Sequence, residues 1–195
     1  MTSLDAEELI KELILTIRTI NHDKLVSLSS YLSRSCFFVS PASTKFHGCF
    51  KGGLAVHSLN VYRLFKEFSS LYELNVSEDD IIICGLLHDI CKCGAYIDSG
   101  AGYFWNKSSH PSGHGKLSVS MLESFIPLSK LQKEIILYHM GMYGVVNPGS
   151  YINEYSLTDL LRVFSNNIPA KVFSFCDELA TIKEKLATEN SGSKK

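Results

Sequence analysis

Histidine and aspartate residues recur within apolar segments of this chain, where they could bind metal ions. His57 shares the apolar stripe of a predicted helix with Val61, because residues four apart lie on one helical face. The pair His88 and Asp89 directly follows the apolar run 81–87. An ionised carboxylate behind such a run is costly unless a cation compensates it. Imidazole with carboxylate is a ligand set for Zn, Mn, Fe, Co or Ni.

Two more inward positions extend this pattern. His139 follows Ile135 on the apolar face of its predicted helix, and Asp177 lies at helical spacing between Phe173 and Ala180. Taken singly, an inward His is more often a hydrogen-bonded core residue, and a helix Asp is more often solvated. Four helices that each deliver an inward His or Asp could instead form one metal site in a bundle core. Spacing alone leaves the two interpretations even.

The hydrophobic periodicity predicts that helices position these residues. The predicted helices run from a cap at Thr2 or Ser3 through Ile20, over 23–32, over 52–74, from a Ser77 cap to near Gly94, over 116–125, 129–140 and 157–165, and from Pro169 onward. Residues 37–50 are expected to form a loop, and residues 94–113 a loop or short β-hairpin. Because no repeat or linker is evident, we expect one all-α domain over residues 1–190 and a disordered tail over 191–195.

The composition excludes several classes of protein. With 195 residues, 45% of them hydrophobic and 20% charged, the chain has the size of one globular domain and is too apolar for a disordered protein. Its 19 Lys and Arg nearly balance its 20 Asp and Glu, so no overall charge attracts nucleic acid or anionic lipid. The longest apolar run is far shorter than the roughly 20 residues of a membrane span. The acidic first residues do not resemble a secretory signal, so we expect a cytoplasmic protein without a membrane partner.

Two segments resemble the signature of the HD-domain metal-dependent phosphohydrolases. They are His47-Gly-Cys-Phe-Lys-Gly-Gly-Leu-Ala-Val-His57 and Leu86-Leu-His-Asp-Ile-Cys-Lys92. The motif order of that family is a His, then a His-Asp pair, then a distal Asp, and its dinuclear members add two histidines before the distal Asp. In this chain His114 and His139 match those two positions, and Asp177 matches the distal Asp. The resemblance covers residues 37–185, and it extends to small stand-alone HD proteins of bacteria and phages.

The resemblance implies an all-α, single-domain helical bundle of the HD type that binds divalent metal ions. It implies two ions, drawn from Mn, Fe, Zn, Co, Ni or Mg. The implied ligands are His57, His88, Asp89 and Asp177 for the first ion and His114 and His139 for the second, with Asp89 bridging both. The implied reaction is attack of a metal-activated hydroxide on the phosphorus of a phosphoester. The substrate would be a nucleotide or a short oligonucleotide.

Further residues are candidates for catalysis or substrate binding. The resemblance gives Lys92 a place at the pocket rim, contacting phosphate or supporting a ligand, although a Lys at a helix C-terminus is also favoured by the helix dipole alone. His47 could contact phosphate or orient a ligand, or be an ordinary loop residue. Lys51 could attract an anionic substrate. The aromatic residues 103–105 could stack on a base, but packing of a lid onto the core is the favoured interpretation.

Two alternative functions remain open at this point. An RNA or DNA exonuclease, as in the HD modules attached to some exoribonucleases, predicts a basic groove beside the metals, and the balanced charge counts against it. A non-catalytic module that senses a metal or nucleotide is disfavoured by the intact ligand set. The chain also departs from the family pattern at two positions. Cys91 replaces the usual Gly after His-Asp-Ile, and Lys116 replaces an acidic residue found in similar small proteins.

Overall fold

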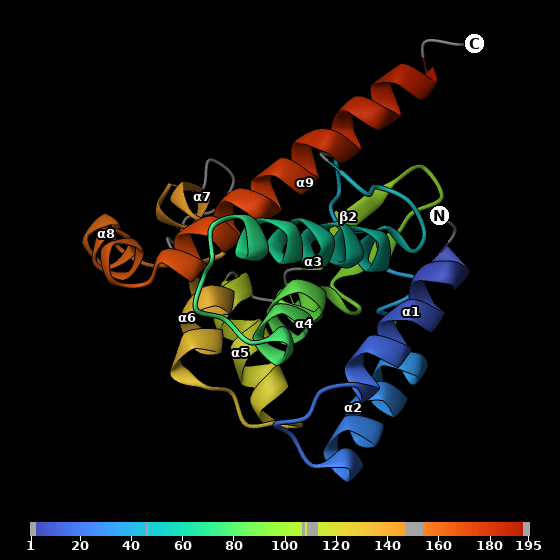
Figure 1. Cartoon of the computed structure of the whole chain (residues 1–195). Coiled ribbons are helices and arrows are strands. Elements are labelled where there is room, and N and C mark those ends of the chain that lie inside the picture. The colour runs from blue at the N-terminus through green and yellow to red at the C-terminus, as the bar shows by residue number, and fades with distance from the viewer. Residues whose placement is uncertain (1–2, 46, 107, 109–112, 147–153, 193–195) are drawn as a thin grey trace.

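The computed structural model describes residues 3–45, 47–106, 108, 113–146 and 154–192. Within them, nine α-helices, one 3₁₀ turn (η1) and one β-hairpin form the fold (Figure 1). The elements are α1 Ser3–Leu15, α2 His22–Arg34, α3 Gly53–Leu71, α4 Glu78–Leu87, η1 Ile90–Lys92, β1 Tyr96–Asp98, β2 Tyr103–Trp105, α5 His114–Glu123, α6 Lys130–Tyr138, α7 Met142–Val145, α8 Leu157–Asn166 and α9 Ile168–Gly192. The predicted all-α class is therefore confirmed.

Helix α3 is the centre of the bundle. It packs against α4, α9 and α1, and α9 also packs against α6. Figure 1 shows α1 and α2 on one side of α3, α5 to α8 on the other, and the last turns of α9 extending beyond the bundle. Apolar side chains fill the space between these helices, and the ring centroids of Phe65 and Phe173 lie 4.9 Å apart in an edge-to-face contact between α3 and α9. Among the described helices, none combines the length and the apolar character required to cross a membrane.

A small residue brings α4 close to α3. A Cβ atom at Gly85 would lie 2.6 Å from the Cα of Tyr62, which is closer than carbon atoms approach without displacement. Only glycine allows this spacing. Because Gly85 lies three residues before His88, the close contact also determines how deeply the end of α4 enters the bundle.

Two helices end well before the residue at which the prediction ends them. Helix α1 ends at Leu15 and does not continue through Ile20, because the buried Asp79 carboxylate accepts the backbone N–H groups of Arg18 and Thr19 and holds that segment as a turn. Helix α4 begins at the predicted Ser77 cap but ends at Leu87, well before Gly94. Residues 88–94 form a separate turn, in which Gly94 has the left-handed φ of 70° expected of a stop.

The segment around residues 94–113 contains the hairpin that was one of the two predicted forms. β1 and β2 pair antiparallel with Ile97 opposite Phe104.

The short helix α7 is absent from the prediction, since four residues are too few to show periodicity. Helix α9 is described up to Gly192, and residues 193–195 of the expected tail lie outside the described residues. The boundaries of the single domain stay a prediction.

Candidate metal centre

Five of the six predicted ligands converge between α3, α4, α6 and α9. His57 comes from the first turns of α3 and Asp177 from α9. His88 and His139 are the C-caps of α4 and α6, and Asp89 follows His88 as the N-cap of η1. His57, His88, Asp89 and His139 are each at most 2% exposed. The ends of α4 and α6 bring His88, Asp89 and His139 into the core, because the chain turns there after apolar turns that pack against the neighbouring helices.

Asp177 joins two of the histidines. Its Oδ1 lies 3.0 Å from Nε2 of His57 and 3.6 Å from Nε2 of His88. The three potential ligand atoms lie within 4.8 Å of one another. This spacing is suited to one metal ion bound by two imidazoles and a carboxylate.

Asp89 lies between two imidazoles. Its Oδ2 is 3.5 Å from Nε2 of His88, and its Oδ1 is 3.5 Å from Nε2 of His139. These three residues form a second group whose ligand atoms lie within 4.8 Å of one another. Each carboxylate oxygen of Asp89 therefore faces a different histidine.

The other ring nitrogens of these two histidines bind backbone carbonyls. Nδ1 of His88 lies 3.2 Å from the carbonyl oxygen of Gly85, and Nδ1 of His139 lies 2.7 Å from that of Ile136. A carbonyl only accepts, so Nδ1 carries the proton in the neutral ring and Nε2 presents a lone pair. Among the described residues, Nε2 of both rings and Oδ1 of Asp89 have no hydrogen-bond partner. Buried lone pairs that face one another in this way fit a divalent cation.

The protonation of the centre shows how strongly it favours positive charge. Burial raises the pKa of Asp89 and Asp177, but the cationic groups around them more than offset it and hold both pKa values well below the usual range. Burial lowers the pKa of His57, yet its hydrogen bonds to Asp177 and Glu184 raise it to about 10. Burial likewise lowers the pKa of His139, and the Asp89 carboxylate, 3.5 Å from its Nε2, raises it to about 9. In the metal-free protein, protons therefore occupy both nitrogens of His57 and of His139 at neutral pH, where a metal ion would have to displace them.

Lys92 lies inside the bundle and not at the predicted rim. It is 7% exposed, and its Nζ lies 2.6 Å from Oδ2 of Asp89. Lys92 lies inside because α4 ends early and η1 turns it back toward the carboxylate three residues before it. In this position the ammonium group supports Asp89 directly.

His114, the sixth predicted ligand, belongs to none of the groups described so far. It is the first residue of α5, and its Nδ1 lies 3.3 Å from Oε1 of Glu154. Glu154 also accepts the backbone N–H groups of His114 and Gly115 at 3.0 and 3.1 Å. The ring of Trp105 contacts the ring of His114 with centroids 4.9 Å apart. Glu154 was not among the predicted site residues, because it belongs to no periodic segment that would have marked it.

A further histidine and a further glutamate adjoin His57. The ring centroids of His47 and His57 are 4.5 Å apart, and the ligand atoms of His47, His57 and Glu184 form a third group within 4.8 Å. Burial, followed by the charges of His57 and Lys92, lowers the pKa of His47 to about 4, so its ring is neutral. Glu184 was also missed, although it follows Asp177 by seven residues, two turns along the same helical face.

The remaining candidates lie farther out. Lys51 is exposed just before α3. In the hairpin, Trp105 packs against Tyr96 and His114, as a lid on the core would, while Phe104 is 60% exposed.

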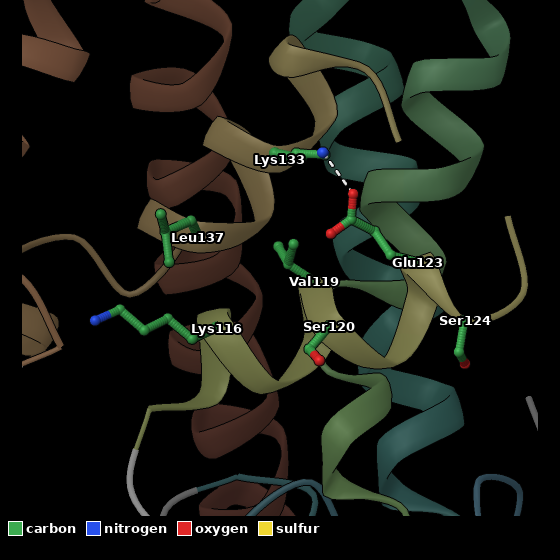
Figure 2. A pocket seen from close by; sticks show the side chains of 7 residues that line it. All are labelled: Lys116, Val119, Ser120, Glu123, Ser124, Lys133 and Leu137. Carbon is green, nitrogen blue, oxygen red and sulfur yellow. Dashed lines mark ion pairs between the residues drawn. The ribbon is translucent and has the colours of Figure 1, made fainter. Parts of the chain in front are cut away.

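An open groove of about 510 Å³ lies on the outer side of α5 and α6 (Figure 2). Lys116 lines this groove on one side and the ion pair of Lys133 with Glu123 lies on the other, with Val119 between them, and none of the clustered histidines and aspartates lines it.

Comparison with known proteins agrees with this geometry. The family model of the HD domain matches residues 54–182. A dihydroneopterin 2′,3′-cyclic phosphate phosphodiesterase of Methanocaldococcus jannaschii is 30% identical over 125 residues, which are 60% of this chain and 49% of that relative. The match thus spans about half the length of the relative. No solved structure matches the chain. The family match covers more than half of the chain and includes each residue of the two central histidine–aspartate groups, so this protein belongs to the HD-domain family.

Proposed function

We propose that this protein is a metal-dependent phosphohydrolase that cleaves a phosphodiester of a nucleotide or a short oligonucleotide. One observation carries the proposal: the buried Asp89 carboxylate faces His88 with one oxygen and His139 with the other. A carboxylate between two imidazoles is suited to bridge two cations. We therefore assign His57, His88, Asp89 and Asp177 to a first metal ion and His139, with His114, to a second.

The residues of the chain prepare the centre for this chemistry. The backbone carbonyls of Gly85 and Ile136 fix the tautomers of His88 and His139, and Lys92 keeps Asp89 ionised and oriented. Divalent cations bound there would lower the pKa of water from about 16 toward 7 and offset the charge on the phosphate oxygens. Apolar helices around the centre exclude bulk water, which strengthens each of these electrostatic interactions.

The substrate class is inferred from two sources. The similar protein of M. jannaschii is named for a cyclic phosphodiester, which supports a small phosphodiester here. An exonuclease would need a cationic groove, and the described groove on α5 and α6 has Lys133 paired with Glu123 at 2.5 Å. We retain Lys51, exposed before α3, and His47, beside His57, as proposed contacts for the substrate phosphate.

Metal content and turnover test this function together. Protein purified without chelator is analysed for bound elements and then assayed with Mn²⁺, Fe²⁺, Zn²⁺, Co²⁺, Ni²⁺ and Mg²⁺ on cyclic nucleotides, linear dinucleotides, nucleoside monophosphates and single-stranded RNA. We expect bound transition metal and hydrolysis of the cyclic or dinucleotide diesters. Preferred processive cleavage of RNA would instead show an exonuclease, and nucleotide binding without turnover under every metal would show a sensor.

A further inference from the structure

We propose that Glu184 is a positioning residue that holds His57 for metal binding through its Nδ1 atom. This role rests on the proposed function, since it presumes that His57 binds a metal through Nε2. Both carboxylate oxygens of Glu184 lie 3.3 Å from Nδ1 of His57. On the opposite side of the ring, Nε2 lies 3.0 Å from Asp177. The ring is thus held between two carboxylates of α9, one at each nitrogen.

The position of His57 in its helix explains why it needs a side chain for this contact. His88 and His139 are C-caps, where carbonyls three residues earlier are available to accept from Nδ1. His57 lies inside α3, where the preceding carbonyls accept helical hydrogen bonds. Its Nδ1 proton therefore needs an acceptor from another element, and Glu184 of α9 supplies one.

Glu184 is itself held in place. Its Oε1 accepts a hydrogen bond from Nδ2 of Asn60 at 2.7 Å, and its side chain is 13% exposed. Asn60 follows His57 by three residues, so the same face of α3 presents the ring and the amide to one carboxylate. A fixed carboxylate acceptor makes an imidazole more basic and orients its other nitrogen, and loss of such a partner lowers metal affinity by about 10–100-fold.

This contact is separate from the features that identify the family. The family match ends at residue 182, two residues before Glu184. The heptad step from Asp177 to Glu184 places both carboxylates on one face of α9. Glu184 therefore affects the affinity of the first metal ion by way of His57.

The test compares Zn²⁺ binding by the full-length protein and its Glu184→Gln variant. Zn²⁺ affinity is measured by competition with a chromophoric chelator, and the nitrogen chemical shifts of His57 are measured by NMR of the Zn²⁺-loaded protein. We expect Glu184→Gln to bind the same number of Zn²⁺ ions, one of them about 10–100-fold more weakly, with a shifted Nδ1 resonance. Asn60→Ala, which leaves Glu184 present but removes its support, should cause a smaller loss in the same direction.

Glu178→Gln is the matched control, because it removes the same charge from an exposed position of the same helix. It should leave affinity and the His57 shifts unchanged. If Glu184→Gln and Asn60→Ala both bind Zn²⁺ like the parent with unchanged shifts, the role of Glu184 is refuted and the proposed function stands. Loss of one whole Zn²⁺ equivalent would also refute it, since Glu184 would then be a ligand in the group with His47. A parent protein that binds no Zn²⁺ or other divalent ion would overturn the proposed function together with this role.

Discussion

At the scale of single residues, Asp89 determines the chemistry of the centre. It lies 2% exposed among one ammonium group and two imidazoles, with Nζ of Lys92 only 2.6 Å away. Such a charge is tolerated inside a protein only because its partners compensate for the lost hydration. Removing the carboxylate therefore affects metal binding and folding at once, and the two effects have to be separated.

We expect Asp89→Ala to abolish metal binding and turnover. We also expect it to lower the free energy of unfolding by about 3–5 kcal/mol, because Lys92 is left buried without its partner. In the double variant Asp89→Asn, Lys92→Met, much of that stability should return while metal and activity stay absent. Elemental analysis, urea unfolding and turnover of the three proteins provide the measurements, and full activity in Asp89→Ala would refute the mechanism.

His114 tests the second metal ion. Because it lies outside the two central groups and pairs with Glu154, we expect His114→Ala to lose one metal equivalent while the first ion stays bound with unchanged affinity. Turnover should fall less than in Asp89→Ala. His22→Ala, an exposed histidine of α2, is the control. If His114→Ala retained two metal ions per chain, the assignment of His114 would be wrong.

The pKa values of two histidines predict a pH dependence of the metal-free protein. His57 and His139 have pKa values raised to about 10 and about 9, against roughly 6.5 in an unfolded chain. The folded state then binds more protons than the unfolded state at pH values above about 6.5, so its stability is fully present below that pH and falls as pH rises. Chelator-treated protein should show a melting temperature that decreases from pH 6.5 to 8.5, and with Mn²⁺ the stabilisation by metal should increase over the same interval. A melting temperature of the metal-free protein that stays flat or rises would contradict this.

Sequence reasoning could find the proposed ligands but not the residues that contact them. His57, His88, His139 and Asp177 stand out because a polar residue at an apolar helical position needs an explanation. Glu154 and Glu184 act through contacts between elements far apart in the chain. The local periodicity of the sequence does not reveal such contacts. Lys92 was found as a residue but misplaced, since its direction depends on where α4 ends.

At the scale of elements, the approach of α4 to α3 positions His88 and Asp89. Gly85 allows this approach, because any side chain there would meet the backbone of Tyr62. The carbonyl of Gly85 also accepts from His88, so a displacement of α4 would move a proposed ligand and its support together. The sequence showed the glycine within the apolar run but not the neighbouring helix that requires it.

We expect Gly85→Ala to lower the free energy of unfolding by about 1–3 kcal/mol through steric overlap and to weaken metal binding as well. The comparison is Gly94→Ala, where the left-handed φ of 70° costs about 1–2 kcal/mol but an added Cβ meets open space. Thermal unfolding and metal titration of both variants provide the measurement. Equal metal affinity in both would show that the α3–α4 spacing does not position His88.

At the scale of the whole molecule, the centre joins helices from the first and last thirds of the chain. α3 and α9 meet through His57, Asp177 and Glu184, while the ends of α4 and α6 supply the other proposed ligands. The all-α class was predictable because each helix carries its own periodicity. The order in which the helices pack was not, because it depends on contacts over more than a hundred residues.

Metal should therefore stabilise the whole bundle. A ligand that binds only the folded state adds about 2.7 kcal/mol when its concentration is 100 times its Kd. We expect Mn²⁺ or Zn²⁺ to raise the melting temperature in a concentration-dependent way and a chelator to reverse the effect. The same titration of Asp89→Asn, Lys92→Met should show no shift. If the melting temperature of the parent protein changes with neither metal nor chelator, a metal site shared by four helices is contradicted.

The placement of Asp177 and Glu184 on α9 has a consequence for biosynthesis. While the ribosome still holds these residues in its exit tunnel, His57 and His88 have already emerged without the carboxylate that pairs with both of them. A nascent chain stalled at that stage has two of the three residues of the group formed by His57, His88 and Asp177. That group is therefore complete only after α9 has been synthesised, whereas the group of His88, Asp89 and His139 does not depend on α9.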